Sequence, residues 1–466
     1  MTSRKLTNVL IVLGILFLTL ITYLIMIEVV YKDEYLKKDT TRTAAIETKV
    51  KRGTIFDRNG EILAYSEFDE NGEQKRYYPF DNLYCHVIGR SNSLLEYKYN
   101  NVLLDNSPAK KYTDQKDIGN DLVLTIDHNL QKAAHDALKG YNGAIIVSNP
   151  KTGEIYAMVS NPDFTLEELE KGTTKATSQI PRVVQSRYSP GSTYKIVTAA
   201  ALIESGNEDF ERFDDGAFVI ENTERTIANY GGASPDKTLE LNEAFYTSSN
   251  VYFAAAAKKV GKKRMKDMAK EFLIGEKIDF DFSDSEVSTS TFCDTLTDEL
   301  CPYSGIGQAK GQALTPLHIN LITSTVANDG KMMQPHLVKE IKSGKNVVES
   351  TDEKIIAEPI SERTANKIKG FMKNVVLYGT GRSVNKNFNY SKSVEICGKT
   401  GTAQNIGGKN DKDHALFTGF APYDDPEICV TVVLEYVDNG KSGGSTAAPV
   451  AGKIINEYYK LKNKSE

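Results

Sequence analysis

The sequence predicts an α+β fold in which distant parts of the chain share one sheet. Apolar, strand-like runs come in two groups, at residues 143–159 and 393–434, and mainly helical patterns lie between them. Residues 51–115 alternate polar and apolar side chains around two hairpin signals, and an apolar run near the N-terminus precedes them. We therefore expect a central sheet covered by helices, a small β-rich region before it and one N-terminal transmembrane helix.

The composition is that of an ordinary globular chain. It has 466 residues, of which 40% are apolar and 26% charged, and its net charge is −5. This length is enough for more than one domain and a large core. The acidic balance gives no sign of a nucleic-acid partner.

The run from Val9 to Ile27 has the length of a membrane-spanning helix. Its few polar or small residues are Gly14, Thr19, Thr22 and Tyr23. Arg4 and Lys5 precede it, which places the N-terminus in the cytoplasm and the rest outside. A cleaved signal peptide is the alternative, but the run is longer than a usual signal and no A-x-A-like site follows. Residues 1–31 are therefore predicted to be a cytoplasmic stub and a single-pass anchor in the cell membrane.

The rest of the chain divides near residue 120. Residues 32–120 are predicted to be a juxtamembrane linker and a small β-rich domain, with turns at Asn59-Gly60 and Asn71-Gly72. Residues 121–466 are predicted to form one larger domain. In it, Asp127 should cap a helix that runs to Leu138, and an amphipathic helix should close the chain at 447–460.

A serine and a lysine stand at helical spacing in the middle of the chain. Ser192 follows a Pro-Gly turn, and the Ala-rich apolar run 196–203 predicts a helix just after it. Lys195 lies three residues later, on the same helical face. A hydroxyl beside an amine at a helix N-terminus is the arrangement of an activated nucleophile. An ordinary helix cap with a solvated lysine has the same local pattern.

Two further motifs favour the activated nucleophile over the ordinary helix cap. Ser248 and Asn250 form an S-x-N motif before the apolar run 251–257, and a K-T-G-T segment at 399–402 follows a strand-like run. A second K-T-G, at 151–153, links two apolar strands and indicates a hairpin turn. S-x-x-K, S-x-N and K-T-G in this order are a strong combined signal of serine acyl-transfer chemistry.

The three motifs resemble those of the penicillin-binding proteins, in particular the monofunctional class B transpeptidases. Residues 52–64 resemble the membrane-proximal signature of that class, and residues 124–131 resemble the entry to its catalytic domain. Residues 305–308 and 314–317 resemble a segment that packs behind the active site. The resemblance implies a five-stranded antiparallel sheet flanked by helices, an all-helical subdomain beside it and a cleft between the two. Only a reduced form of the family's N-terminal module fits before the catalytic domain.

The resemblance also implies a reaction: a peptidoglycan D,D-transpeptidase that β-lactams inhibit. Ser192 would attack the carbonyl between two terminal D-alanines of a stem peptide, with neutral Lys195 as the base. Ser248 would pass a proton to the departing D-alanine, and Asn250 would hold a substrate amide. An amine from a neighbouring stem peptide would then resolve the acyl-enzyme and form a crosslink.

The K-T-G-T segment suits the substrate's terminal carboxylate. Lys399 offers a charge, which would also keep the neighbouring lysine neutral, and Thr400 and Thr402 offer hydroxyl donors. Gly401 would let an extended substrate lie close to the strand edge. The family implies an oxyanion hole made by the backbone N–H groups of Ser192 and Thr402. The alternative for Lys399 is a solvated lysine that protects an edge strand.

Other functions share part of this pattern. A membrane-anchored serine β-lactamase or a D,D-carboxypeptidase would use the same motifs, while a β-lactam sensor or an inactive cell-wall scaffold would not be an enzyme. A sensor needs an output domain, and a scaffold would be expected to lack part of the motifs. The serine chemistry requires no cofactor. The implied partners are stem peptides, β-lactams, the membrane and a polymerase of the lipid-linked disaccharide, lipid II.

The cysteines raise a separate question. There are five: Cys85, Cys293, Cys301, Cys397 and Cys429. An odd number outside the cell cannot pair completely within one chain. Cys397 shares a strand face with Lys399, Cys301 lies just before the segment expected behind the cleft, and Cys293 neighbours Asp294. Cys293, Cys301 and Cys397, with Asp294 as a fourth ligand, could hold a structural zinc ion. A Cys293–Cys301 disulfide and unbonded buried thiols are the alternatives.

Overall fold

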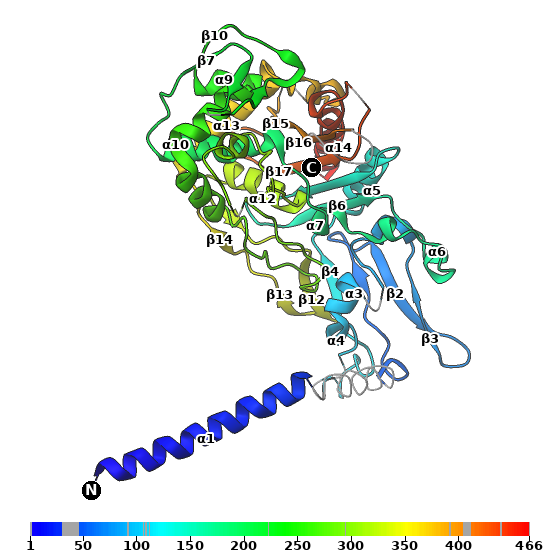
Figure 1. Cartoon of the computed structure of the whole chain (residues 1–466). Helices are drawn as coiled ribbons and strands as arrows, with labels where there is room; N and C mark the ends of the chain where they lie inside the picture. Colours follow the sequence, from blue (N-terminus) through cyan, green and yellow to red (C-terminus); the bar gives the residue numbers. More distant parts are fainter. Residues whose placement is uncertain are drawn as a thin grey trace.

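The computed structural model describes residues 2–465 apart from 30–45, 91–92, 106, 108–109, 111, 222, 294, 391–392, 404–411 and 439. Helix α1 (Thr2–Val29) extends away from the other elements (Figure 1). Among the described residues, no helix combines the length and the apolar content needed to cross a membrane.

A five-stranded antiparallel sheet forms the centre of the larger part of the chain, in the order β15-β16-β17-β5-β6. Its strands come from two distant stretches, as the sequence predicted: β5 (Gly143–Ser148), β6 (Ile155–Asn161), β15 (Cys397–Ala403), β16 (His414–Ala421) and β17 (Ile428–Leu434). β15, which carries the K-T-G-T segment, is an edge strand.

Both faces of this sheet are buried because its residues alternate between two apolar clusters. Along β5, Ile145 and Val147 join one cluster, whereas Ala144 and Ile146 join the other. The first cluster includes helices α5 (His128–Leu138) and α14 (Ala448–Ser465). The second includes α8 (Lys195–Glu204), α12 (Pro316–Ala327) and α13 (Glu362–Leu377). Figure 1 shows α5 and α14 beside the sheet on the side away from α10 and α13.

The predicted caps and turns at α5 and β5 are confirmed. The Asp127 carboxylate accepts a hydrogen bond from the backbone N–H of Leu130, and α5 ends at Leu138. Residues 149–154 form the turn between β5 and β6, and Gly153 has a φ of +82° there. The second K-T-G is therefore part of a hairpin and lies outside the site described below.

The region between the two strand groups was expected to be all-helical, and it also contains short strands. Its helices are α9 (Leu241–Thr247), α10 (Asn250–Glu271) and α11 (Cys301–Gly305). Two small antiparallel pairs cover them: β7 (Arg212–Asp214) with β10 (Lys237–Leu239), and β8 (Ala217–Val219) with β9 (Thr226–Ala228). These strands have three residues each and lie in a polar stretch, so they leave little periodic signal.

A six-stranded sheet forms the N-terminal region, in the order β13-β12-β4-β1-β2-β3. Its strands are β1 (Ile55–Phe56), β2 (Ile62–Phe68), β3 (Gln74–Tyr77), β4 (Asp121–Leu124), β12 (Val338–Ser343) and β13 (Asn346–Ser350). The two predicted hairpin turns join β1 to β2 and β2 to β3. The sheet extends past the predicted boundary at residue 120, because β4 and the hairpin β12–β13 belong to it. This hairpin ties the N-terminal region to the catalytic part of the chain.

The remaining elements are short. They are β11 (Met332–Met333), β14 (Ile355–Ala357), α3 (Leu94–Lys98), α4 (Asn100–Leu103), α6 (Leu166–Glu170), α7 (Arg182–Gln185), the 3-10 turns at 81–84, 176–179, 191–194, 230–232 and 382–387, and one π-helical turn at 443–447.

Candidate active site

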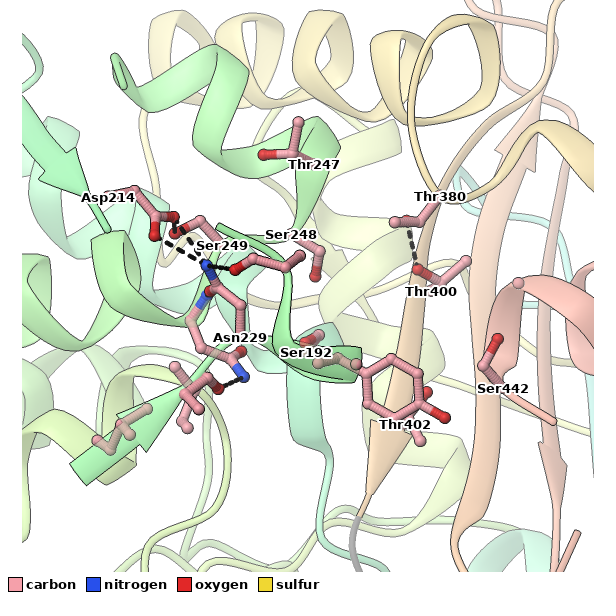
Figure 2. Close-up of a pocket in the computed structure, with 18 of the residues that line it drawn as sticks. Ser192, Asp214, Asn229, Thr247, Ser248, Ser249, Thr380, Thr400, Thr402 and Ser442 are labelled. Atoms are coloured by element: carbon pink, nitrogen blue, oxygen red, sulfur yellow. Dashed lines mark hydrogen bonds between the residues drawn. The ribbon is translucent and has the colours of Figure 1, made fainter. Parts of the chain in front are cut away.

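The three sequence motifs meet at one cleft between the five-stranded sheet and the helical region. Its volume is about 810 Å³, and Ser192, Ser248, Asn250, Thr400 and Thr402 are among the residues that line it. Figure 2 shows Ser192 and Ser248 beside each other, with Thr400 and Thr402 on the neighbouring strand β15. The predicted nucleophile and the predicted substrate-binding residues are therefore brought together.

Ser192 lies in a 3-10 turn, Gly191–Tyr194, that leads directly into α8. The preceding Gly191 has a φ of +50°, and a Cβ there would lie 2.7 Å from the carbonyl oxygen of Thr402. Glycine is therefore needed for this turn to pack onto β15. This packing places the half-buried Ser192 and the strand residue Thr402 on the same part of the cleft wall.

Lys195 is fully buried behind the cleft. Its Nζ lies 2.7 Å from the backbone oxygen of Ser248, 2.7 Å from Oδ1 of Asn250 and 3.2 Å from Oγ of Ser248. Burial lowers the pKa of Lys195 far below its usual value, and the charge of Lys399 lowers it further. A neutral amine can donate to the two carbonyl oxygens and still accept a proton, as a general base must.

Lys399 is the second buried amine, and it reaches the same serine from the opposite side. Its Nζ donates to Oγ of Ser248 at 2.8 Å and to the backbone oxygen of Thr400 at 3.2 Å. Burial lowers the pKa of Lys399 to about 7. The hydroxyl of Ser248 thus bridges two amines, which is the position that a proton relay requires.

Ser248 holds this bridging position through an unusual backbone conformation. It is the C-cap residue of α9 with a φ of +63°, in the left-handed region, and α10 begins two residues later. Ser249 caps α10 by accepting a hydrogen bond from the N–H of Tyr252. The S-x-N motif is therefore a tight corner between two helices, and its two functional side chains both point to Lys195.

The strand wall of the cleft carries hydroxyl groups. Oγ1 of Thr400 lies 2.6 Å from Oγ1 of Thr380, which follows α13 (Figure 2). Oγ1 of Thr402 accepts a weak hydrogen bond, 3.5 Å long, from the N–H of Gly443. The structure gives Gly401 a packing role: a Cβ there would lie 2.9 Å from Cγ2 of Thr193. Gly401 thus lets the serine turn pack against β15.

Two polar residues of the site left no signal in the sequence. Asp214 ends β7 and Asn229 follows β9, and both hydrogen-bond to the S-x-N corner. Their separation from Ser249, 35 and 20 residues along the chain, follows no motif. Only the fold brings them together.

The zinc site expected at the cysteines stays a prediction. Within the described residues, no three His, Cys, Asp or Glu side chains are grouped so that they could hold a metal ion, and Asp294 lies outside these residues. The thiol of Cys301 donates to the backbone oxygen of Ala257, whereas Cys293 and Cys397 are buried among apolar side chains. Burial raises the pKa of Cys301 to about 11 and that of Cys397 higher still, which disfavours the thiolate a metal needs. All five cysteines are free thiols, so the Cys293–Cys301 disulfide is absent as well.

The site can be compared with known proteins. A model of the penicillin binding protein transpeptidase domain matches residues 143–456. The peptidoglycan D,D-transpeptidase MrdA of Haemophilus influenzae is 31% identical over 382 residues, which cover 73% of this chain and 56% of MrdA. The peptidoglycan D,D-transpeptidase PbpA of Mycolicibacterium smegmatis is 29% identical over 87% of this chain and 88% of its own length.

A solved structure agrees with these relatives. The penicillin G acyl-enzyme complex of penicillin-binding protein A from M. tuberculosis superposes with a TM-score of 0.79 at 25% identity, over 88% of this chain and 100% of that one. The matched family model covers all three motifs and the whole five-stranded sheet. The chain therefore belongs to the penicillin-binding protein transpeptidase family.

Proposed function

We propose that this protein is a class B peptidoglycan D,D-transpeptidase that crosslinks stem peptides through an acyl-enzyme on Ser192. The observation that carries the proposal is the Ser248 hydroxyl held between two buried amines, beside Ser192. Such a pair of like charges destabilises a folded protein unless one amine is neutral. A neutral lysine next to a serine is what nucleophilic attack on an amide requires.

The proposed steps assign these residues the following roles. Lys195 accepts the proton of Ser192 while the serine oxygen bonds to the penultimate D-alanine carbonyl. The proton then passes through Ser248 to the nitrogen of the departing D-alanine as the amide bond breaks. A stem-peptide amine attacks the ester and forms the new amide, and its proton returns along the same path. When Lys399 is protonated, its charge favours proton transfer away from Lys195.

The position of β15 supports the proposed substrate orientation. β15 is an edge strand, so an extended D-Ala-D-Ala peptide can add to it as a further strand. The substrate carboxylate would then lie near the hydroxyl groups of Thr400 and Thr402, and the acyl carbonyl near the N–H groups of Ser192 and Thr402.

A hydrolase is the second candidate, and the cleft gives it less support. A β-lactamase needs a base that activates water against the acyl-enzyme. Of the described residues that line the cleft, only Asp214 is acidic, and both of its oxygens accept hydrogen bonds from the protein. This favours a long-lived acyl-enzyme and transfer to an amine.

The test is intact mass after incubation with penicillin. The wild-type chain should gain one penicillin on a peptide that contains Ser192, and S192A should gain none while keeping its thermal unfolding temperature. The adduct should outlast many turnover times of a β-lactamase. An adduct on another serine, or rapid release of hydrolysed penicillin, would contradict the proposal.

We further propose that residues 1–31 anchor the protein in the cell membrane, with the cleft outside. The apolar run 9–27 supports this, as do the exposed apolar side chains along α1 such as Leu10, Leu13 and Phe17. A chain that starts at residue 32 should leave the membrane fraction and still react with penicillin. A truncated chain that remains with the membrane would contradict the anchor.

The last part of the proposal is a partner, a lipid II polymerase in the same membrane. The family resemblance supports it, and Figure 1 shows the N-terminal sheet on the side of the molecule where α1 lies. Crosslinking during membrane isolation should capture a second membrane protein through residues 46–124. If replacing residues 46–124 abolishes capture while the catalytic part stays intact, the result would support this region as the contact surface.

A further inference from the structure

Asp214 is a buried carboxylate that touches the active-site corner. It is fully buried at the end of β7 and accepts four hydrogen bonds from three neutral donors. These are Oγ of Ser249 at 2.5 Å, Nδ2 of Asn229 at 2.8 Å and 3.0 Å, and the backbone N–H of Gly216 at 2.9 Å. Figure 2 shows Asp214, Ser249 and Asn229 as one group to the left of Ser248. No described cation lies within ion-pair distance of Asp214, so its charge is not neutralised by direct contact.

Two chains of contacts lead from this carboxylate to the reacting amine. In the first, Ser249 donates to Asp214 and caps α10, which fixes the left-handed Ser248 beside it. In the second, Asn229 donates to Asp214 and accepts the N–H of Asn250 at 2.7 Å. Oδ1 of Asn250 then accepts from Lys195 at 2.7 Å. Asp214 thus supports both residues of the S-x-N motif that contact Lys195.

The charge of Asp214 acts on the same amine. The charged groups that act on Lys195 come from two elements: Lys399 on β15, which disfavours its protonated form, and Asp214 on β7, which favours it. Both lysines are fully buried, so these charges are weakly screened. Burial is the largest cause of the lowered pKa of Lys195, and the balance between these two charges adjusts it.

We propose that Asp214 is a positioning residue for acylation: it fixes the Ser248–Asn250 corner and supplies the negative charge opposed to Lys399. This inference rests on the proposed function. Asp214 takes no part in bond making, because its oxygens are held by Ser249 and Asn229.

The test is the second-order rate constant for penicillin acylation of the full chain, measured across about pH 5–10. D214N should slow acylation about tenfold to a hundredfold, because the S-x-N corner is displaced. It should also move the acid limb of the profile to lower pH, since Lys195 loses the charge that favours its proton. D214E keeps the charge and should leave the limb in place while the rate falls.

A matched control lies next to this residue. Asp215 is exposed, and D215N makes the same change of formal charge. Solvent and salt screen an exposed carboxylate, so D215N should leave both the rate and the limb at wild-type values. An equal shift of the acid limb in D214N and D215N would overturn the proposal, because the shift would then reflect the net charge of the protein alone.

Two further outcomes decide the question. A D214N protein with the wild-type rate and limb overturns the proposal, even if its unfolding temperature falls. If D214N does not fold, S249A takes its place, because it keeps the charge of Asp214 and removes one of its hydrogen bonds. Slower acylation with an unmoved acid limb of the pH profile supports the proposal. Acylation at the wild-type rate overturns it. Failure of the wild-type chain to acylate at Ser192 would instead contradict the proposed function.

Discussion

In the described part of the chain, two clusters of buried ionisable side chains are built in opposite ways. In the N-terminal sheet, Glu96 of α3 lies between Arg52 and Arg76, with contacts of 2.6 Å and 2.8 Å. In the active site, Lys195 and Lys399 lie on either side of the uncharged Ser248. The first cluster pairs unlike charges, and the second brings like charges together.

The pKa directions follow from this difference. Burial alone would raise the pKa of Glu96, but Arg76 and Arg52 outweigh it and the pKa is lowered. Burial lowers the pKa of Lys195, and its neighbour lowers it further. A buried carboxylate kept charged by two arginines stabilises a junction, since it joins segments around residues 52, 76 and 96. A buried amine that is kept neutral can instead act as a base in catalysis.

The largest expected effect is on catalysis at the like-charged pair. K195M should slow penicillin acylation about 10²- to 10⁴-fold, because the general base is lost. Its unfolding free energy should fall less than that of the Glu96 variant below, since a neutral amine is replaced by an apolar chain of similar length. Acylation rates and urea unfolding measure both. A K195M acylation rate within tenfold of the wild-type rate would contradict the role of Lys195 as the general base.

The Glu96 cluster should show the opposite pattern. E96Q leaves two buried guanidinium groups without their counter-charge, so unfolding free energy should fall by about 3–5 kcal/mol. The wild-type contribution should be present above the usual glutamate pKa and be lost as pH falls through the lowered folded value. Folded E96Q should keep the wild-type acylation rate per active site. A loss of rate without a loss of stability would contradict the structural role.

Lys399 offers a pH test of the same contrast. Its folded pKa is about 7, below the unfolded value of 10.5, so between these values the unfolded chain holds a proton that the folded chain lacks. Stability should therefore rise with pH in this range, by up to about 1.4 kcal/mol per pH unit, relative to K399M. A constant difference between the two proteins from pH 7 to about pH 9 would show that Lys399 is not buried as described.

The sequence predicted the parts of the fold that depend on local signals. The Asp127 cap, the β5–β6 hairpin and the helix after Ser192 are confirmed, because each depends on residues within a few positions of one another. The site motifs were found because serine acyl-transfer chemistry needs fixed short spacings. Their meeting at one cleft followed from the family resemblance, since spacing alone does not bring 192, 248 and 399 together.

The rest depended on contacts between distant segments. The hairpin β12–β13 joins the N-terminal sheet by pairing with β4 more than 200 residues earlier, and strand pairing of this kind has no local signature. Asp214 was missed for the same reason. The zinc site stays a prediction: within the described residues no three candidate ligands are grouped, and Cys397 lies in the apolar core.

The smallest expected effect is at exposed charges, which supply a baseline for both clusters. Asp136 on α5 contacts Lys132 at 2.8 Å and Lys139 at 2.7 Å, and all three side chains are exposed. Water screens such pairs, and holding long side chains in place opposes the gain. D136N should therefore lower unfolding free energy by less than about 1 kcal/mol, and the difference should fade in high salt. If D136N lost as much unfolding free energy as E96Q, burial would not explain the strength of the Glu96 cluster. An exposed carboxylate with two partners would then stabilise the fold as much as a buried one.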